Sequence, residues 1–206
     1  MIEVRKATTA ELADIIRIGR EVFSATFGHS VPHSDLEAYL ESAYTEPLIT
    51  EELRDDSKDI IVAVHHDNQH ATMRHRSNSH FDSSIGTSKS SDSREEGKVV
   101  GFAQLTRGSS SGEPCLASLD HVASTAELQR LFVDLSYHGK GIGSRLARTI
   151  EDIARRDGFT HMWLGVWEEN TVAKQVYEKL GYTALGFHDF VVGSIVQRDH
   201  ILMKAL

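Results

Sequence analysis

The chain has 206 residues, of which 40% are hydrophobic and 25% are charged, and its formal net charge at pH 7 is −8. The length favours one domain, and the absence of any apolar run near the roughly 18 residues of a membrane span argues against a membrane protein. Nucleic acid is disfavoured as a partner because clustered Lys and Arg bind its phosphates, whereas the negative charge fits a cationic substrate. The N-terminus lacks a signal-peptide pattern, so we expect a cytoplasmic protein with a single domain over residues 1–206.

The first 50 residues predict one strand followed by two helices. The short stretch IEVRKA at residues 2–7 is typical of a strand. Thr8 and Glu11 have the spacing of a capping box, which marks the start of a helix. The helix that follows has an apolar stripe formed by Leu12, Ile15, Ile16, Val22 and Phe23. Ser34 is expected to cap a second helix, DLEAYLESAY.

Two short β-branched stretches, DIIVAVHH at residues 59–66 and KVVGFAQLTR at residues 98–107, predict a hairpin. Between them lies an insertion at 66–97 that is rich in Ser, His and charged residues. Its few large apolar residues cannot offset the entropy of ordering, so we expect a flexible, mostly disordered loop. The histidines in and beside it are His65, His66, His70, His75 and His80. Their spacing matches no compact ligand set, and no metal site is predicted.

The second half of the chain predicts further strands and helices. In chain order we expect a strand at 126–135, a helix at 143–157 ended by Gly158, a strand at 161–167, a helix at 171–180 between its cap Asn170 and Gly181, and strands at 186–192 and 200–206. This order departs from a regular alternation of strand and helix. The sequence therefore predicts a mixed α/β fold and disfavours a doubly wound parallel sheet.

The segment YHGKGIGSRL, residues 137–146, places three glycines at alternate positions before a predicted helix. Backbone N–H groups that are free of side chains at a helix N-terminus form a potential anion site. Two phosphate motifs do not match: the ATP-binding loop requires Gly-Lys-Ser/Thr at its end, and the dinucleotide motif requires a third glycine where Ser144 stands. A glycine turn that binds no ligand is the alternative.

A second motif, NTVAKQVYEKLGY, follows at residues 170–182. Together with HGKGIG it resembles the GNAT superfamily of N-acetyltransferases, whose motifs are R/Q-x-x-G-x-G/A and N-x-x-A-x-x-x-Y-x-K-x-G-F/Y. The second motif matches in full, whereas His138 stands where Arg or Gln is usual. The resemblance implies an α/β GNAT fold, with a mixed, mostly antiparallel central sheet splayed between strands 4 and 5 and helices on both faces.

Four further stretches narrow the resemblance. FSATFGH, LEAYLESAY, LGVWEEN and the C-terminal GFHDFVVGSIVQRDHILMKAL are similar to the PaiA-type branch, the spermidine/spermine N-acetyltransferases and their relatives. The similarity covers nearly the whole chain outside the insertion. It implies acetyl-CoA as cosubstrate and a small-molecule primary amine as acceptor.

The resemblance also implies which residues contact CoA. On the fourth strand, the backbone of Leu131, Phe132 and Val133 would pair with the pantetheine arm. The turn that would bind the pyrophosphate consists of His138, Gly139, Lys140, Gly141, Ile142, Gly143 and Ser144. On the following helix, Asn170, Ala173 and Tyr177 would contact the pantetheine and the sulfur.

Acetyl transfer requires a neutral amine, yet at pH 7 only about one part in a thousand of an amine with a pKa near 10.4 is neutral. By resemblance, Glu127 is the candidate general base, acting directly or through water, and Tyr177 is the candidate general acid for the leaving thiolate. From the residues alone, Glu127 is equally well a solvated carboxylate at a strand end, and Tyr177 a packing tyrosine. The residues implied for the acceptor pocket are Phe27, His29, Trp167 and His188.

The sequence thus predicts an acetyl-CoA-dependent N-acetyltransferase that acts on a small primary amine, with a polyamine as the first choice. Alternatives are an aminosugar such as glucosamine, another amine, or a catalytically weak sensor that binds CoA. The protein is expected to be a monomer or a homodimer. The lone Cys115 cannot form an internal disulfide and is interpreted as a passive loop residue.

Overall fold

The computed structural model of the chain describes residues 1–66 and 97–206. The strands are β1 Ile2–Lys6, β2 Lys58–His65, β3 Lys98–Thr106, β4 Thr125–Val133, β5 His161–Trp167, β6 Thr183–Val192 and β7 Ile195–Ala205. The α-helices within the described ranges are α1 Leu12–Phe27, α2 His33–Ala43, α3 Glu46–Arg54, α4 Ile142–Arg156 and α5 Thr171–Lys179. Apart from its two end residues, the predicted insertion lies outside the described residues, and so do His70, His75 and His80.

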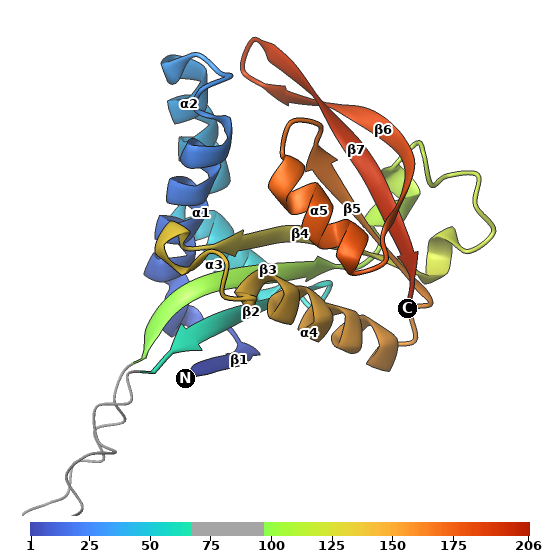
Figure 1. Cartoon of the computed structure of the whole chain (residues 1–206), viewed down its shortest axis with the longest axis horizontal. Helices are drawn as coiled ribbons and strands as arrows, with labels where there is room; N and C mark the ends of the chain where they lie inside the picture. Colours follow the sequence, from blue (N-terminus) through green and yellow to red (C-terminus); the bar gives the residue numbers. More distant parts are fainter. Residues whose placement is uncertain (67–96) are drawn as a thin grey trace, which may run out of the picture.

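The strands form one sheet in the order β1-β2-β3-β4-β5-β7-β6 (Figure 1). Every neighbouring pair is antiparallel except β4 and β5, which run parallel. The β4–β5 register covers only three pairs and stops at Glu127 and Trp163. β4 nevertheless continues to Val133 and β5 to Trp167. The two strands therefore separate beyond Glu127, which confirms the predicted mixed sheet with a splay between strands 4 and 5.

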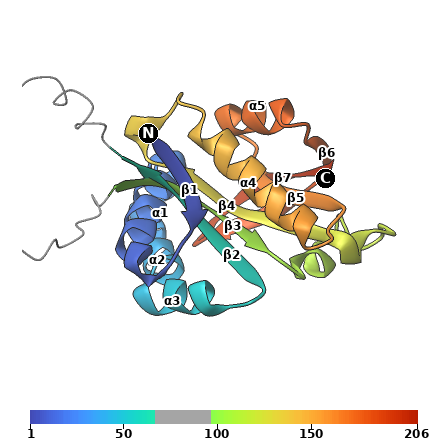
Figure 2. The same ribbon diagram turned by 90° about the horizontal axis from the view of Figure 1, so that it is seen from below.

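Helices cover both faces of this sheet (Figure 2). α1, α2 and α3 pack on one face, and α4 and α5 pack on the other. β2 shows why two layers form: Ile60, Val62 and Val64 belong to the core under α1–α3, whereas Ile61 and Ala63 belong to the core under α4. Because successive side chains of a strand point to opposite faces, a strand that is apolar at every position requires cover on both sides.

A β-bulge in β4 determines which side chains share a face. Gln104 pairs with Arg130 and Leu105 pairs with Leu128, so Gln129 is an extra residue on β4. Gln129 Oε1 accepts hydrogen bonds from Gln104 Nε2 at 2.8 Å and from the Thr106 hydroxyl at 2.7 Å. These bonds hold the bulge in place. The bulge lies just beyond Glu127, where β4 stops pairing with β5.

Local chemistry explains the N-terminal elements. The capping box is confirmed: Glu11 Oε2 accepts from the Thr8 amide at 2.8 Å, and a one-turn 3-10 helix leads into α1. The predicted Ser34 cap is wrong, because α2 begins at His33 and Pro32 stands at the cap with φ −53° and ψ 141°. The sequence analysis missed α3, which Thr45 caps by accepting from the Leu48 amide at 3.3 Å.

The turn between β6 and β7 is attached to α2. Asp35 Oδ2 accepts from the amide of Ser194 at 2.8 Å and from its hydroxyl at 2.6 Å. Gly193 allows this approach, because a Cβ at that position would lie 2.3 Å from Asp35 Cγ.

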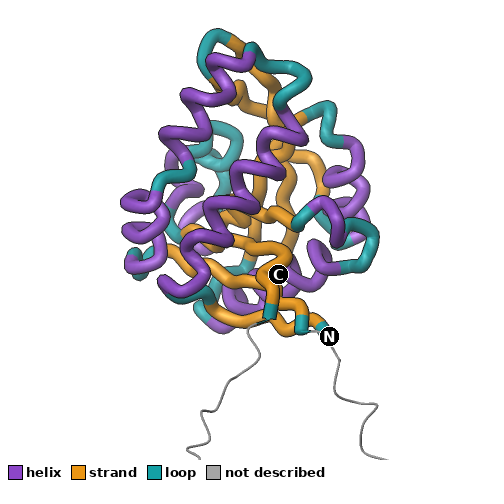
Figure 3. Tube along the Cα trace, turned by 90° about the vertical axis from the view of Figure 1, so that its left-hand side faces the viewer, coloured by secondary structure: helices purple, strands orange, loops and turns teal. Residues whose placement is uncertain are grey.

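Figure 3 views the molecule from its α1–α2 side, where helices lie in front of the strands. Within the described ranges, the structure contains no helix with the length and apolar character needed to cross a membrane.

Candidate active site

The glycine turn presents its backbone at the N-terminus of α4. Gly139 and Gly141 have φ of 74° and 75°, a conformation that side chains disfavour, although a Cβ at either position would meet no atom within 4 Å. The backbone N–H groups of residues 139–144 have no acceptor among the described residues. The first N–H groups of any helix lack partners within it, so this turn can receive an anion.

His138 is turned away from those free N–H groups. Its Nε2 lies 2.9 Å from the Val133 carbonyl oxygen, and its amide donates to the Leu135 carbonyl at 3.3 Å. Lys140 likewise folds back, because its ammonium donates to the Ser136 carbonyl and lies 4.3 Å from the centre of the Tyr137 ring. The structure thus leaves the backbone from Gly139 onward as the part of the turn that is open to an anion.

α5 positions the two predicted residues of the second motif. Asn170 caps the helix, because its Oδ1 accepts from the Ala173 amide at 3.1 Å. Tyr177 is buried in the core beneath α4 and α5, and its ring centre lies 5.8 Å from that of Tyr182. Burial raises the pKa of Tyr177 to about 12. Its hydroxyl makes no hydrogen bond to a described residue. Because its pKa is raised, it keeps at neutral pH a proton that it can donate.

Glu127 occupies the last position at which β4 pairs with β5. It is opposite Thr106 of β3 on one side and Trp163 of β5 on the other. Burial raises the pKa of the Glu127 carboxyl above its ordinary value, and repulsion from Glu113 adds to the shift. A carboxylate with a raised pKa is a better proton acceptor, and Glu127 stands where the sheet opens.

A second group of ionisable residues lies on the same sheet face as Glu127. His188 of β6 pairs with Asp199 of β7, which pairs with Trp167 of β5. His188 Nδ1 is 2.7 Å from Glu113 Oε2, and His188 Nε2 is 3.9 Å from Asp199 Oδ2. Burial raises the pKa of Asp199 to about 6, although His188 opposes the shift.

Gly165 keeps this face open. It lies between Trp163 and Trp167 on β5, and it is exposed. A Cβ at Gly165 would lie 3.4 Å from Asp199 Oδ2 and 3.8 Å from His188 Nε2. The two ionisable side chains therefore extend over the bare backbone of Gly165.

The structure brings three of the predicted acceptor residues together. The Trp167 ring centre is 5.1 Å from that of Phe27 and 5.5 Å from that of His29. Phe27 ends α1, so the helical layer borders the end of β5 at this point. The fourth predicted residue, His188, joins the group through the row of Trp167 and Asp199 across three strands.

The two sides of the sheet thus carry different chemistry. Tyr177 and the start of α4 belong to one face, because Gly143 lies against β4 with a built Cβ 3.5 Å from Leu131 Cδ2. Glu127, Gly165 and the ionisable group belong to the opposite face. The two faces meet along the edge of β4 beyond Glu127, where β5 no longer pairs with it.

Sequence reasoning missed Glu113, Gly165 and Asp199. Glu113 lies in a loop between β3 and β4, and no local pattern relates it to His188, 75 residues later. Asp199 carried a usable signal, because a carboxylate in a strand between inward-facing Gln197 and Ile201 must itself face inward. A glycine between two tryptophans of a strand also signals close approach by another group.

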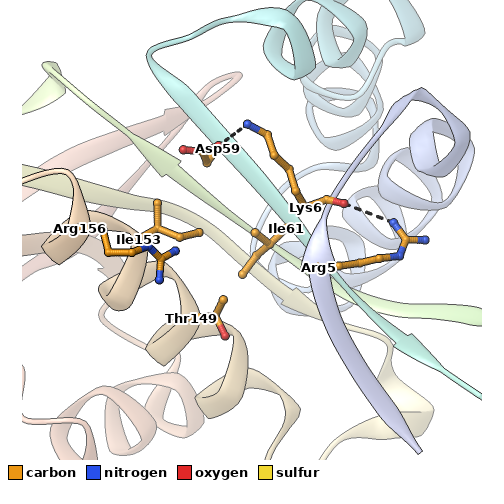
Figure 4. A pocket seen from close by; sticks show the side chains of 7 residues that line it. All are labelled: Arg5, Lys6, Asp59, Ile61, Thr149, Ile153 and Arg156. Atoms are coloured by element: carbon orange, nitrogen blue, oxygen red, sulfur yellow. Dashed lines mark hydrogen bonds and ion pairs between the residues drawn. The ribbon is translucent and has the colours of Figure 1, made fainter.

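A separate cavity of about 300 Å³ lies between β1, β2 and α4 (Figure 4). Its lining residues are Arg5, Lys6, Asp59, Ile61, Thr149, Ile153 and Arg156. Lys6 is paired with Asp59 at 2.6 Å and Arg5 with Glu11 at 2.7 Å, so two of its cations are already neutralised. None of the predicted site residues lines this cavity. No group of three or more potential metal ligands occurs in the described part of the chain.

Comparison with known proteins gives a consistent result. The acetyltransferase (GNAT) family profile matches residues 37–182. An uncharacterized N-acetyltransferase of Lactobacillus delbrueckii subsp. lactis is 24% identical over 205 residues, covering 100% of this chain and 98% of the relative. The PaiA N-acetyltransferase of Thermoplasma acidophilum, solved with coenzyme A, has a TM-score of 0.67 at 22% identity over 100% of this chain and 99% of its own.

An acetyltransferase of Salmonella typhimurium, solved with acetyl-CoA, has a TM-score of 0.58 at 19% identity, covering 100% of this chain and 94% of its own. These likenesses confirm the predicted fold, and the family profile covers well over half of the chain. The chain therefore belongs to the GNAT family and is an N-acetyltransferase that uses acetyl-CoA as its cosubstrate.

Proposed function

We propose that the protein acetylates a primary amine of a small polycation, with spermidine and spermine as the preferred acceptors, and that it belongs to the PaiA-type branch. The observation that carries this proposal is that Glu113 and Asp199 lie beside His188, on the sheet face that also carries Glu127. Three carboxylates favour an acceptor with more than one ammonium group over one with a single charge. The net charge of −8 adds a long-range attraction for a polycation.

Among these carboxylates, Asp199 has a buried oxygen that lacks a partner in the described part of the chain. Its Oδ1 is buried without a hydrogen-bond partner among the described residues, and burial raises its pKa to about 6. An ammonium group of the substrate would supply the missing partner and favour the ionised carboxylate. The aromatic rings of Phe27, His29 and Trp167 would line the methylene chain beside it.

In this proposal CoA binds on the opposite face. The free N–H groups from Gly139 to Ser144 would hold the pyrophosphate at the start of α4, with the Ser144 hydroxyl beside them. The backbone of Leu131, Phe132 and Val133 would pair with the pantetheine along the part of β4 that β5 leaves free. The expected pyrophosphate contact of the His138 amide is left out, because that amide already donates to Leu135.

Glu127 would take one proton from the substrate ammonium, directly or through water, and the neutral nitrogen would attack the thioester carbonyl. As the new C–N bond forms and the C–S bond breaks, Tyr177 would protonate the sulfur of CoA. The nitrogen loses its second proton in the same sequence, and that proton restores the Tyr177 hydroxyl. The raised pKa of Tyr177 keeps it protonated between turnovers at neutral pH.

The test is CoA release from acetyl-CoA with spermidine, spermine, glucosamine, lysine and a short peptide. We expect the highest kcat/KM with a polyamine, and we expect Asp199→Asn to raise its KM. The matched control is Asp189→Asn, since Asp189 is exposed on the same strand as His188 but on the opposite sheet face. A preference for glucosamine or the peptide would contradict the acceptor proposal, and CoA binding without turnover of any amine would contradict the catalytic roles.

A further inference from the structure

Glu113 and His188 form a close pair that the proposed reaction does not yet use. Glu113 lies in the loop between β3 and β4, and its side chain is 4% exposed. Its Oε2 is 2.7 Å from His188 Nδ1, and its Oε1 accepts from the Cys115 amide at 3.0 Å. Both carboxylate oxygens are thus engaged, so the loop holds Glu113 in one orientation.

This contact determines which nitrogen of His188 carries the proton. Burial disfavours ionisation of Glu113, but its hydrogen bonds to Cys115 and His188 outweigh burial and lower its pKa. An ionised carboxylate only accepts hydrogen bonds, so Nδ1 must be the donor. In the neutral ring Nε2 is then an acceptor with a free lone pair.

The free nitrogen faces the acceptor side of the sheet. His188 Nε2 lies 3.8 Å from the position of a Cβ on Gly165 and 3.9 Å from Asp199 Oδ2. The charged groups beside the ring are Glu113 from the loop and Asp199 from β7, and Glu127 lies on the same sheet face further along, opposite Trp163 of β5. The ring is 31% exposed, so His188 can pass a proton to water.

We propose that Glu113 is a positioning residue that fixes the ring of His188, and that Nε2 of His188 receives the proton released by the substrate amine and passes it to water. The inference rests on the proposed function, in which Glu127 removes that proton first. An ammonium N–H bond breaks, the proton passes through Glu127 and intervening water, an Nε2–H bond forms, and the imidazolium then releases the proton to solvent. The second proton of the amine follows the Tyr177 route to the sulfur.

The first measurement determines which nitrogen of His188 carries the proton in the wild-type protein. A long-range ¹H–¹⁵N spectrum of the full-length protein at pH 7.5 distinguishes a protonated from an unprotonated imidazole nitrogen, and His188→Gln identifies the His188 signals. We expect Nδ1 to be protonated and Nε2 to be free, and we expect this preference to weaken in Glu113→Gln. A ring protonated at Nε2 would overturn the proposal.

The second measurement is kinetic and uses whichever amine the wild-type protein acetylates fastest. Glu113→Gln should lower kcat roughly tenfold with little change in KM for the amine. The shape of its pH profile should differ from that of wild type, because the ring of His188 is no longer held with Nδ1 as the donor. Asp189→Asn, which removes a charge from the opposite sheet face, should behave as wild type.

A third measurement protects the test against a variant that merely disturbs the loop. His188→Ala should be partly rescued by added imidazole, since the ring is accessible to solvent. A wild-type pH profile in Glu113→Gln, a change confined to KM, or the absence of imidazole rescue would each contradict the proton route. If the fastest amine is not a polyamine, the acceptor proposal fails while the role of the pair is still measured.

Discussion

Replacing Tyr177 by Phe separates catalysis from stability. The Tyr177 side chain is buried, and its hydroxyl has no hydrogen-bond partner among the described residues. Phe keeps the ring that packs against Tyr182 and removes only the hydroxyl. Because that hydroxyl makes no hydrogen bond to a described residue, the stability of the variant should stay within about 1 kcal/mol of wild type.

Catalysis should respond more strongly than stability. A positioned general acid contributes about 100-fold or more to the rate, so kcat should fall roughly 100-fold, which corresponds to about 2.7 kcal/mol of transition-state free energy. The assay combines urea unfolding with CoA release at saturating acetyl-CoA. Tyr182→Phe is the matched control, since Tyr182 is a buried tyrosine in the same core and has no proposed contact with CoA.

Two outcomes would refute the reasoning. A loss of more than about 1 kcal/mol of stability in Tyr177→Phe would mean that the hydroxyl is hydrogen-bonded in the folded protein. An unchanged kcat, or an equal loss in Tyr182→Phe, would mean that Tyr177 does not donate the proton. Since burial raises the pKa of Tyr177 to about 12, wild-type activity should also show no loss from its ionisation between pH 7 and 10.

Three further predictions concern the turn, a buried ion pair and a histidine pair. Gly141→Ala forces an alanine to φ 75° without a steric clash, so it should lower the free energy of unfolding by about 1–2 kcal/mol. It should also weaken CoA binding in calorimetry, and an unchanged affinity would contradict the role of the turn. Glu52 is 6% exposed and contacts Arg130 and Lys58, so Glu52→Ala should lose about 3 kcal/mol in urea unfolding, and a loss below about 1 kcal/mol would count against the pair. Burial opposes ionisation of Glu52, but these cations lower its pKa, so its stabilisation should be present above its ordinary value of 4.5 and disappear as pH falls below it. The ring of His161 stacks on that of His121 with their centres 3.8 Å apart, and burial together with His121 lowers the pKa of His161. The melting temperature should therefore fall as the pH drops below 6.5, and His161→Gln should flatten that dependence.

The secondary structure followed from local patterns where the patterns were strong. The capping box at Thr8, the strands at 59–66 and 161–167 and the Asn170 cap depend on residues close together in sequence, and each is where it was expected. Local reasoning was wrong at Ser34, because the fixed φ of Pro32 starts α2 two residues earlier. It overlooked α3 because a helix of nine residues offers little periodicity.

The sequence by itself determined the α/β class and the glycine turn before α4, because these depend on motifs and spacing. Through its resemblance to a family pattern, it also indicated Glu127 and Tyr177 as candidates. Only the tertiary structure showed that His188 contacts Glu113 and lies with Asp199 over Gly165. Their contacts join a loop to two strands near the C-terminus, and no local pattern encodes such a distance. The separation of β4 from β5 after three pairs is likewise a property of the assembled sheet, since it depends on packing on both faces and not on either strand alone.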